Sequence, residues 1–341
     1  MSQQSAPSAN IRFCSTDIGG LWSIYQQESI NICFLTFFVH HVKDEEITMI
    51  AKESLKQTES RLLRMKQFFE EERYPIPDAF SVNSDVQLDA PPLFHDPFVL
   101  SYVYMMNRLS MINYGFIAAN VSRLDVFEFF KECIQTSSDM YGKALKLMME
   151  KGVYDRPPKM NYPAHNEYVQ KNNFLDGIFG ENRRLNAVEL TEIFFNIERN
   201  YFSIIIMLGF AQVIKDKKLR DFIIRGKNIS EKQIEVFNKL LMEEDLLGMV
   251  TVSMEVTDST TSPFSEKLVM MLIHTLNSVD ITLISHALSL SMRTDLFAHY
   301  TKFAAEVMQY AKDTFDIVVE RQWLEQPPLV TDRRQLIYSN Q

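Results

Sequence analysis

The chain is poor in the residues that break or cross-link a fold. Its 341 residues include 10 glycines, 12 prolines and 3 cysteines. So few glycines and prolines leave room for long elements joined by few turns. The cysteines, Cys14, Cys33 and Cys133, are odd in number and form no Cys-x-x-Cys pair, which argues against a disulfide framework and indicates a reducing compartment. Cys33 and Cys133 lie in apolar stretches, where we expect buried, unreactive thiols.

Positive charge is scarce as well. There are 35 Lys and Arg against 44 Asp and Glu, a net charge of −9. Nucleic acids and anionic lipids both require clustered basic residues, so we expect neither as a partner. The strongest apolar run, 201–214, is shorter than the roughly 20 residues of a membrane span, so we expect no span. The first ten residues lack the basic start and apolar core of a secretion signal, and we expect a cytoplasmic protein.

What the chain does contain is a second copy of itself. Lys43-Asp44 recurs as Lys215-Asp216, an offset of 172 residues (215 − 43). Arg123-Leu-Asp125 recurs as Arg293-Thr-Asp295, an offset of 170 (293 − 123), so the second copy has lost two residues in between. Solenoid repeats have periods of roughly 20–50 residues, so a unit this long is a domain.

Each copy has the hydrophobic spacing of long amphipathic helices. We expect helices at about 16–42, 44–73, 96–120 and 123–152, and again at about 187–214, 216–245, 264–290 and 293–323. A long crossover separates two helical hairpins in each copy, which is the layout of ferritin-like folds. The predicted fold class is all-α: two tandem ferritin-like four-helix bundles from an internal duplication. The predicted divisions are a disordered tail (1–13), a first bundle (14–158), a linker with a short helix at 165–172 (159–185), a second bundle (186–328) and a C-terminal tail (329–341).

A ferritin-like layout raises the question of a metal centre. Di-iron and di-manganese bundles use Glu-x-x-His motifs, and none of the seven histidines has a glutamate three residues before it. We therefore expect no cofactor. A site made of carboxylates alone remains an alternative, with Glu28, Glu59 and Asp139 as its weak candidates. At the equivalent positions the second copy has Asn200, Glu231 and Gln309. There is also no Gly-rich phosphate loop and no Gly-x-Ser-x-Gly elbow, which favours a non-enzymatic role.

The repeated Arg-x-Asp sequence lies where the fourth helix of each copy should begin. Asp125 and Asp295 would face the positive end of that helix. Arg123 and Arg293 could hold the neighbouring helix end through bidentate pairing. Because the sequence recurs in both copies, we predict that these four residues are structural caps.

A stripe of hydroxyl residues follows one face of the seventh long helix. Small side chains in a row permit close helix approach, and their hydroxyls can bond to carbonyls of their own helix. Close packing is the expected role; a polar groove or an interface with a second copy is the alternative. The stripe consists of Thr275, Ser278, Thr282, Ser285 and Ser289.

Several motifs together resemble a known family. They are Tyr74-Pro75-Ile76-Pro77, Arg156-Pro157-Pro158, Phe179-x-x-Asn182-Arg183-x-Leu185-Asn186, Glu255-Val256-Thr257-Asp258-Ser259, Ser262-Pro263-Phe264-Ser265, Met292-Arg293-x-Asp295 and Trp323-Leu324-Glu325-Gln326-Pro327-Pro328. The chain resembles, over about 15–335, an uncharacterised family of tandem ferritin-like bundles from endospore-forming, Bacillus-type bacteria, often labelled spore-coat-like. The resemblance implies the fold and a sporulation setting, with spore association, but no activity. Relatives have a histidine where this chain has Arg61 and Gln233, which weakens an inherited metal role.

Three functions follow as hypotheses. The first is a non-enzymatic structural or interaction protein that binds a protein partner. The second is a degenerate ferritin-like protein that binds metal through carboxylates. The third is a bundle that holds a small apolar ligand between helices, for which the 18 methionines and 25 phenylalanines could supply the lining.

Overall fold

The computed structural model describes residues 11–166, 168–169, 183–246 and 256–338, and in these ranges the chain is all-helical, with two isolated β-bridges as its extended pairings. The helices are α1 (Ser15–His41), α2 (Glu45–Glu71), α3 (Val82–Asp85), α4 (Asp96–Ala118), α5 (Leu124–Glu150), α6 (Ala187–Val213), α7 (Lys217–Glu243), α8 (Glu266–Leu290), α9 (Thr294–Glu320) and α10 (Arg333–Tyr338). The eight long helices predicted from the hydrophobic spacing are confirmed, with ends within three residues of the expected ones.

The repeated Lys-Asp dipeptide explains why two of these helices begin where they do. Asp44 accepts hydrogen bonds from the backbone N–H groups of Glu46 and Ile47 at 3.0 and 3.1 Å. Asp216 accepts from Lys218 and Leu219 at 2.8 and 3.2 Å in the same way. Each aspartate therefore satisfies two N–H groups that have no partner within the helix.

Short elements were predicted less well than long ones. The helices α3 and α10 were not expected. The helix predicted at 165–172 is wrong for 165, 166, 168 and 169, which are not helical, and its other residues lie outside the described ranges. Segments of four to six residues have too few side chains to show a hydrophobic period.

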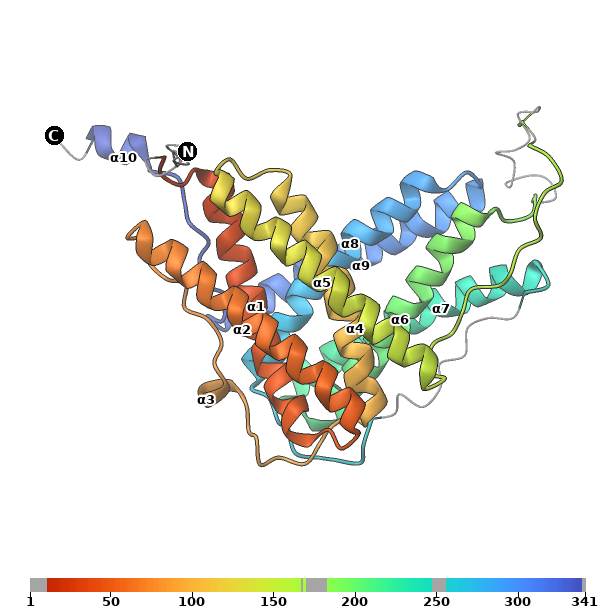
Figure 1. The fold of residues 1–341 in the computed structure, drawn as a ribbon, viewed down its shortest axis with the longest axis horizontal. Coiled ribbons are helices and arrows are strands. Elements are labelled where there is room, and N and C mark those ends of the chain that lie inside the picture. The colour runs from red at the N-terminus through yellow and green to blue at the C-terminus, as the bar shows by residue number, and fades with distance from the viewer. Residues whose placement is uncertain (1–10, 167, 170–182, 247–255, 339–341) are drawn as a thin grey trace, which may run out of the picture.

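The long helices pair as hairpins, α1 with α2, α4 with α5, α6 with α7 and α8 with α9. In the first half α2 packs against both α4 and α5, and in the second half α6 packs against α8 and α7 against α9. Figure 1 shows the two repeated halves as the arms of a V, with α1–α5 forming one arm and α6–α9 the other. α10 projects from the end of the chain, and all its described side chains are exposed.

The two crossovers pair with each other at the base of the V, along the foot of Figure 1. Val86 bridges Phe264 and Phe94 bridges Val256, both in antiparallel sense. The Gln87 N–H donates to the Pro263 carbonyl at 2.8 Å, and the Thr257 N–H donates to the Leu93 carbonyl at 3.0 Å. Because each half contributes the same segment, the pairing relates the two halves by an approximate two-fold axis.

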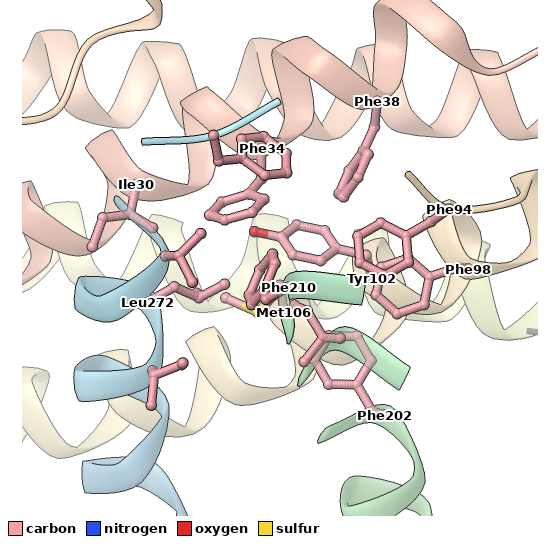
Figure 2. Packing of buried hydrophobic residues seen from close by; sticks show 14 of the residues in the cluster. Ile30, Phe34, Phe38, Phe94, Phe98, Tyr102, Met106, Phe202, Phe210 and Leu272 are labelled. Carbon is pink, nitrogen blue, oxygen red and sulfur yellow. The ribbon is translucent and has the colours of Figure 1, made fainter. Parts of the chain in front are cut away.

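A single aromatic core runs through this junction. Phe34 of α1 lies 5.9 Å from Phe210 of α6 and 4.2 Å from Phe264, measured between ring centroids. Phe98 of α4 stacks on Phe202 of α6 at 5.5 Å. Figure 2 shows Phe34 and Phe98 of the first half and Phe202 and Phe210 of the second half clustered around Tyr102. The Tyr102 hydroxyl donates to Asn31 at 2.7 Å. The halves therefore share buried apolar surface, the dominant source of folding free energy.

Two helices in the described ranges, α6 and α8, are long and apolar enough to cross a membrane by length and composition alone. At least half of the relevant window in each is buried against other helices of the protein. Burial of this kind is what the core helices of a folded domain require, so neither helix is a clear membrane span.

Candidate functional site: a cleft at the junction of the two halves

The repeated Arg-x-Asp sequence lies in a cluster that ties three helix ends together. The Arg123 guanidinium donates to both carboxylate oxygens of Asp125, at 3.0 and 2.5 Å, and also pairs with Glu72 at the C-terminal end of α2. Asp17 in the first turn of α1 accepts from the backbone N–H groups of Ser122 and Arg123, at 2.9 and 3.2 Å. The cluster neutralises the acidic end of α2 and joins α1 to α5.

The second half repeats this cluster residue for residue. Arg293 donates to Asp295 at 3.0 and 2.6 Å and to Glu244, at the end of α7, at 2.7 Å. Glu189 takes the place of Asp17 and accepts from the N–H groups of Met292 and Arg293, both at 3.1 Å. Arg293 is 2% exposed, and its charge is tolerated because both acids lie against it.

The three carboxylates considered for a metal site do not come together. Glu28 is fully buried and accepts from Arg61 Nε at 3.2 Å and from the hydroxyl of Tyr114. Glu59 and Asp139 are both exposed on the surface. No three His, Cys, Asp or Glu side chains of the described residues are grouped so that they could hold a metal ion. Both oxygens of Glu28 are engaged by the chain itself, so the residues present do not fit a di-metal centre.

The second half has neutral side chains where the first half has this charged pair. Asn200 and Gln233 stand at the positions of Glu28 and Arg61, and the Asn200 amide donates to Gln233 at 3.1 Å. Ile284 stands at the position of Tyr114. The same place in the bundle therefore accepts either a salt bridge or an amide pair, which indicates a structural role for both.

Two of the three cysteines are buried, as expected. Cys33 and Cys133 lie in the interior, whereas Cys14 is exposed. Burial raises the pKa of the Cys33 thiol to about 12 and also raises that of Cys133. These two thiols therefore stay protonated and are poor nucleophiles.

A cleft of about 450 Å³ lies between the two halves, and we call it the junction cleft. This volume lies within the roughly 300–1,000 Å³ of small-molecule sites, which often occur at domain interfaces. One wall comes from α1, α4 and the segment 78–80, and the other from α8 and the segment 322–325 after α9. The residues that carry its chemistry are Trp22, Ser23, Gln26, Gln27, Asp78, Phe80, Asn113, Phe116, Lys267, His274, Thr275, Ser278, Thr282, Gln322, Trp323 and Glu325.

Side-chain amides hold the walls of the junction cleft in place. Gln26 Nε2 donates to the Glu325 carboxylate at 2.5 Å and to the Asp78 carbonyl at 3.3 Å, which joins α1 to the segment after α9. Asn113 Nδ2 donates to Gln27 Oε1 at 2.9 Å, which joins α4 to α1. Because these contacts cross between elements, the shape of the cleft is set before any ligand arrives.

Two basic groups face the junction cleft from α8. Burial lowers the pKa of His274, so its imidazole is neutral near pH 7 and lies 6.4 Å from the ring of Phe315. The Lys267 ammonium lies 5.0 Å from the centroid of the Phe80 ring, a cation–π distance. The acids of the cleft are Asp78 and Glu325.

The hydroxyl stripe of α8 corrects one sequence-based expectation. Thr275 and Thr282 donate to carbonyls of their own helix at 3.0 and 3.1 Å, as expected. However, Ser278, Thr282, Ser285 and Ser289 are exposed, and Thr275, Ser278 and Thr282 line the junction cleft. The exposed members of the stripe therefore do not pack closely against another helix. Thr275, Ser278 and Thr282 form part of a polar groove, whereas Ser285 and Ser289 lie on the surface outside it.

Two residues of the cleft could have been noticed in the sequence but were not. Trp22 and Trp323 are the only tryptophans of the chain, and both line the cleft although they are far apart in sequence. The spacing of Trp22 along α1 fits an apolar helix face, so the sequence alone would place it in the bundle core. Only the packing of α1 beside the segment after α9 brings the two rings to one site.

Backbone strain also occurs at the rim. Gln322 has a φ of 58°, in the left-handed region, whereas Gly152 occupies the equivalent position in the first half with a φ of 68°. A residue with a side chain is disfavoured in this conformation. The side chain of Gln322 lines the cleft.

No curated protein matches this chain. One solved structure, described as that of a putative spore coat protein from Bacillus halodurans C-125, is similar with 17% sequence identity and a TM-score of 0.41, covering 46% of this chain and 99% of that one. A family model for proteins of unknown function, DUF3231, matches the chain twice, over residues 3–165 and 173–336. The chain therefore belongs to the DUF3231 family, with one copy of the family unit in each half.

Proposed function

We propose that this protein is a non-enzymatic binding protein that holds its ligand in the junction cleft. The observation that carries the proposal is the cleft itself: a preformed hollow of about 450 Å³, with aromatic walls and several hydrogen-bonding side chains. Sites of this composition bind small organic molecules or single side chains of a partner. The protein would thus bind a partner or a small ligand, as two of the sequence-based hypotheses expect. The binding site would lie between the two halves and not inside one bundle.

The chemistry of the cleft favours binding over catalysis. The hydroxyls of Thr275 and Thr282 donate to carbonyls of their own helix, so His274 does not activate them. A nucleophile that attacks a substrate needs an adjacent base within hydrogen-bond reach. The buried thiols of Cys33 and Cys133 are held in the protonated form.

The remaining parts of the proposal concern the setting. We propose that each half is a ferritin-like four-helix bundle, with limits at 14–158 and 186–328, and that the protein acts in the cytoplasm or at the spore of a spore-forming bacterium. The support for the fold and the setting is the match of the family model to both halves, together with the motifs that resemble that family over nearly the whole chain. A carboxylate metal site is disfavoured, because Arg61 and Tyr114 already engage Glu28.

Tryptophan fluorescence tests the binding proposal directly. Both tryptophans line the cleft, so emission excited selectively from tryptophan reports on this site and on no other. A panel of small cationic, neutral and anionic organic fragments is titrated into the purified full-length protein. We expect at least one class to give a saturable change in emission intensity or wavelength.

A variant that fills the cleft provides the decisive comparison. Ser278→Arg places a long side chain in the cleft and should abolish the change, whereas Ser289→Arg, on the same face of α8 but outside the cleft, should behave like the wild type. Circular dichroism confirms that both variants are folded. If no fragment gives a saturable signal, or if Ser278→Arg responds like Ser289→Arg, the protein does not bind ligands in this cleft.

A further inference from the structure

The junction cleft has a counterpart that the chain fills with its own side chains. The approximate two-fold axis makes α1 equivalent to α6 and α4 equivalent to α8. Equivalent residues differ in number by 172 between α1 and α6 and by 170 between α4 and α8. Asp44 with Asp96 and Asp216 with Glu266 confirm these offsets, because in each half the acid at the start of α4 or α8 accepts from the N–H of the cap residue, at 2.8 and 3.2 Å. We call the counterpart, between α4, α6 and the segment 152–155, the filled junction.

The filled junction is occupied by an arginine. Arg108 of α4 donates to Glu198 of α6 at 2.6 Å and to the Tyr104 hydroxyl at 3.2 Å. Its guanidinium lies over the ring of Phe195, 3.7 Å from the centroid. Asp155 adds a second negative charge near Glu198. A guanidinium between an aromatic face and carboxylates is favourable both as a cation–π contact and as a salt bridge.

The junction cleft has small side chains at the two positions that Arg108 and Phe195 occupy in the filled junction. Ser278 stands where the filled junction has Arg108, and Ser23 stands where it has Phe195. Both serines are exposed and line the cleft. The cleft therefore corresponds to the space that an arginine and an aromatic ring occupy on the other side of the axis.

The junction cleft retains one of the two acids of the filled junction, although it lacks the arginine. Glu325 stands at the position of Asp155, and Gln26, which replaces Glu198, donates to it at 2.5 Å. Asp78 adds a second acid, and Trp22 supplies an aromatic face in place of Phe195, while the ring of Trp323 also contacts Arg321 of the chain itself. Tryptophan is the best side chain for a cation–π contact. Two cations of the chain itself lie beside the site: Lys267 lies 5.0 Å from the centroid of the Phe80 ring, and Arg321, which pairs with Asp216, lies 5.1 Å from the centroid of the Trp323 ring.

Resting on the binding function proposed above, we infer that the junction cleft takes a cationic group on an aliphatic stem, with a guanidinium as the best fit. The group stacks on a tryptophan and pairs with Glu325, as Arg108 stacks on Phe195 and pairs with Glu198 in the filled junction. Its source is either a free small molecule or an arginine side chain of a partner protein. The overall charge of −9 favours the approach of either.

Probes of similar shape and different charge separate the contribution of the positive charge to binding from that of molecular shape. Butylguanidinium, the neutral isostere butylurea and the anion pentanoate are titrated while tryptophan emission is recorded. A pentapeptide with a central arginine and its citrulline analogue, equal in size but uncharged, test the peptide source. We expect butylguanidinium to bind, butylurea to bind about tenfold more weakly, and pentanoate not to bind, since a charge-assisted contact is worth about 1.4 kcal/mol or more.

Three variants locate the interaction. Glu325→Gln should weaken butylguanidinium by about tenfold and leave butylurea unchanged, because only the charged contact is lost. Ser278→Arg should abolish binding of both, and Ser289→Arg should change neither. Tighter binding of the arginine peptide than of butylguanidinium identifies a protein partner as the source; equal or weaker binding identifies a small molecule.

The filled junction serves as a calibration in the same protein. Arg108→Ala removes the arginine and leaves Glu198 unpaired, so the midpoint of thermal unfolding should fall. The test is made together with Ser278→Arg, which blocks the junction cleft. In that background added butylguanidinium should raise the midpoint of Arg108→Ala again, and butylurea should not, because only the guanidinium replaces the lost group.

The outcomes distinguish failure of the cationic-ligand inference from failure of the proposed binding function. Binding of butylurea or pentanoate that is equal to or stronger than that of butylguanidinium, and sensitive to Ser278→Arg, overturns the inference of a cationic ligand and leaves the binding function intact. The same holds if Glu325→Gln binds butylguanidinium as the wild type does. Absence of a signal sensitive to Ser278→Arg for every probe overturns both.

Discussion

Replacing Arg61 with methionine tests how the first half tolerates a buried charge. Glu28 is fully buried and Arg61 is 7% exposed, so neither group is solvated by bulk water. Arg61→Met keeps the volume but leaves the Glu28 carboxylate with only the Tyr114 hydroxyl as a donor. Removing one partner of a buried pair costs about 3–5 kcal/mol, because the remaining charge is uncompensated. We expect the free energy of unfolding to fall by that amount.

The second half indicates which variant should recover the loss. There the same place holds Asn200 and Gln233, with Ile284 where the first half has Tyr114. The triple variant Glu28→Asn, Arg61→Gln, Tyr114→Phe introduces the same uncharged amide pair and removes the phenol hydroxyl, so no charge or hydroxyl is left without a partner. It should lie within about 1–2 kcal/mol of the wild type, since a neutral replacement of a buried ion pair is often nearly neutral in stability.

Urea unfolding followed by far-ultraviolet circular dichroism measures these differences. Arg64→Met is the matched control, because Arg64 lies one turn away on α2 and pairs with Glu71 at the surface. It should cost about 1 kcal/mol or less. Suppose that Arg61→Met lowers the free energy of unfolding no more than Arg64→Met does, and that this free energy depends on urea concentration with an unchanged slope. The Glu28–Arg61 pair would then not be desolvated in solution, and the reasoning would fail. If the triple variant is as unstable as Arg61→Met, the two halves are not equivalent at this position.

Three further predictions concern the backbone and the helix caps. Gln322→Gly should stabilise the protein by about 0.5–1 kcal/mol in thermal or urea unfolding, because glycine adopts the left-handed conformation without strain; no gain would mean that the side chain of Gln322 compensates for the strain. Gly209→Ala should cost about 1–3 kcal/mol, since the new Cβ would lie 2.6 Å from Phe94, whereas Gly142→Ala, with no atom within 4 Å, should stabilise by about 0.5–1 kcal/mol; equal effects would show that Phe94 does not pack on α6. Burial alone would raise the pKa of Asp17, but the N–H groups of Ser122 and Cys14 hold it below the ordinary 3.8, so its contribution is present above that value and lost as the pH falls through the lowered pKa. Asp17→Asn should therefore lower the stability near neutral pH and flatten its loss in acid, and an unchanged acid profile in a pH series of urea melts would contradict this assignment.

The sequence predicted the long helices because each is long enough to show its period and its punctuation. Asp44 and Asp216 begin helices by accepting from N–H groups of the first turn, which is a local interaction. The arginine of each fourth helix was expected to hold the neighbouring helix end by bidentate pairing; in the structure its bidentate partner is the aspartate two residues later, within one ionic cluster on each side. That cluster also includes Glu72 and Glu244, which the sequence did not indicate because they are far away along the chain.

The candidate site was predicted only in fragments. The hydroxyl stripe of α8 was noticed but assigned to close packing, since spacing along one helix does not reveal what faces it. Gln26 and Glu325 were not connected, because 299 residues separate them and their contact depends on how the end of α9 approaches α1.

The sequence by itself determined the long helices and the duplication, because the hydrophobic period and the repeated motifs can both be read along the chain. The tertiary structure decided how the two copies sit together, since the paired crossovers and the aromatic core at the junction depend on contacts between distant segments. The same packing left one junction filled by Arg108 and the other open beside Ser278. Two nearly equal halves thus form one filled and one open junction, because a few side chains at their shared boundary differ in size and charge.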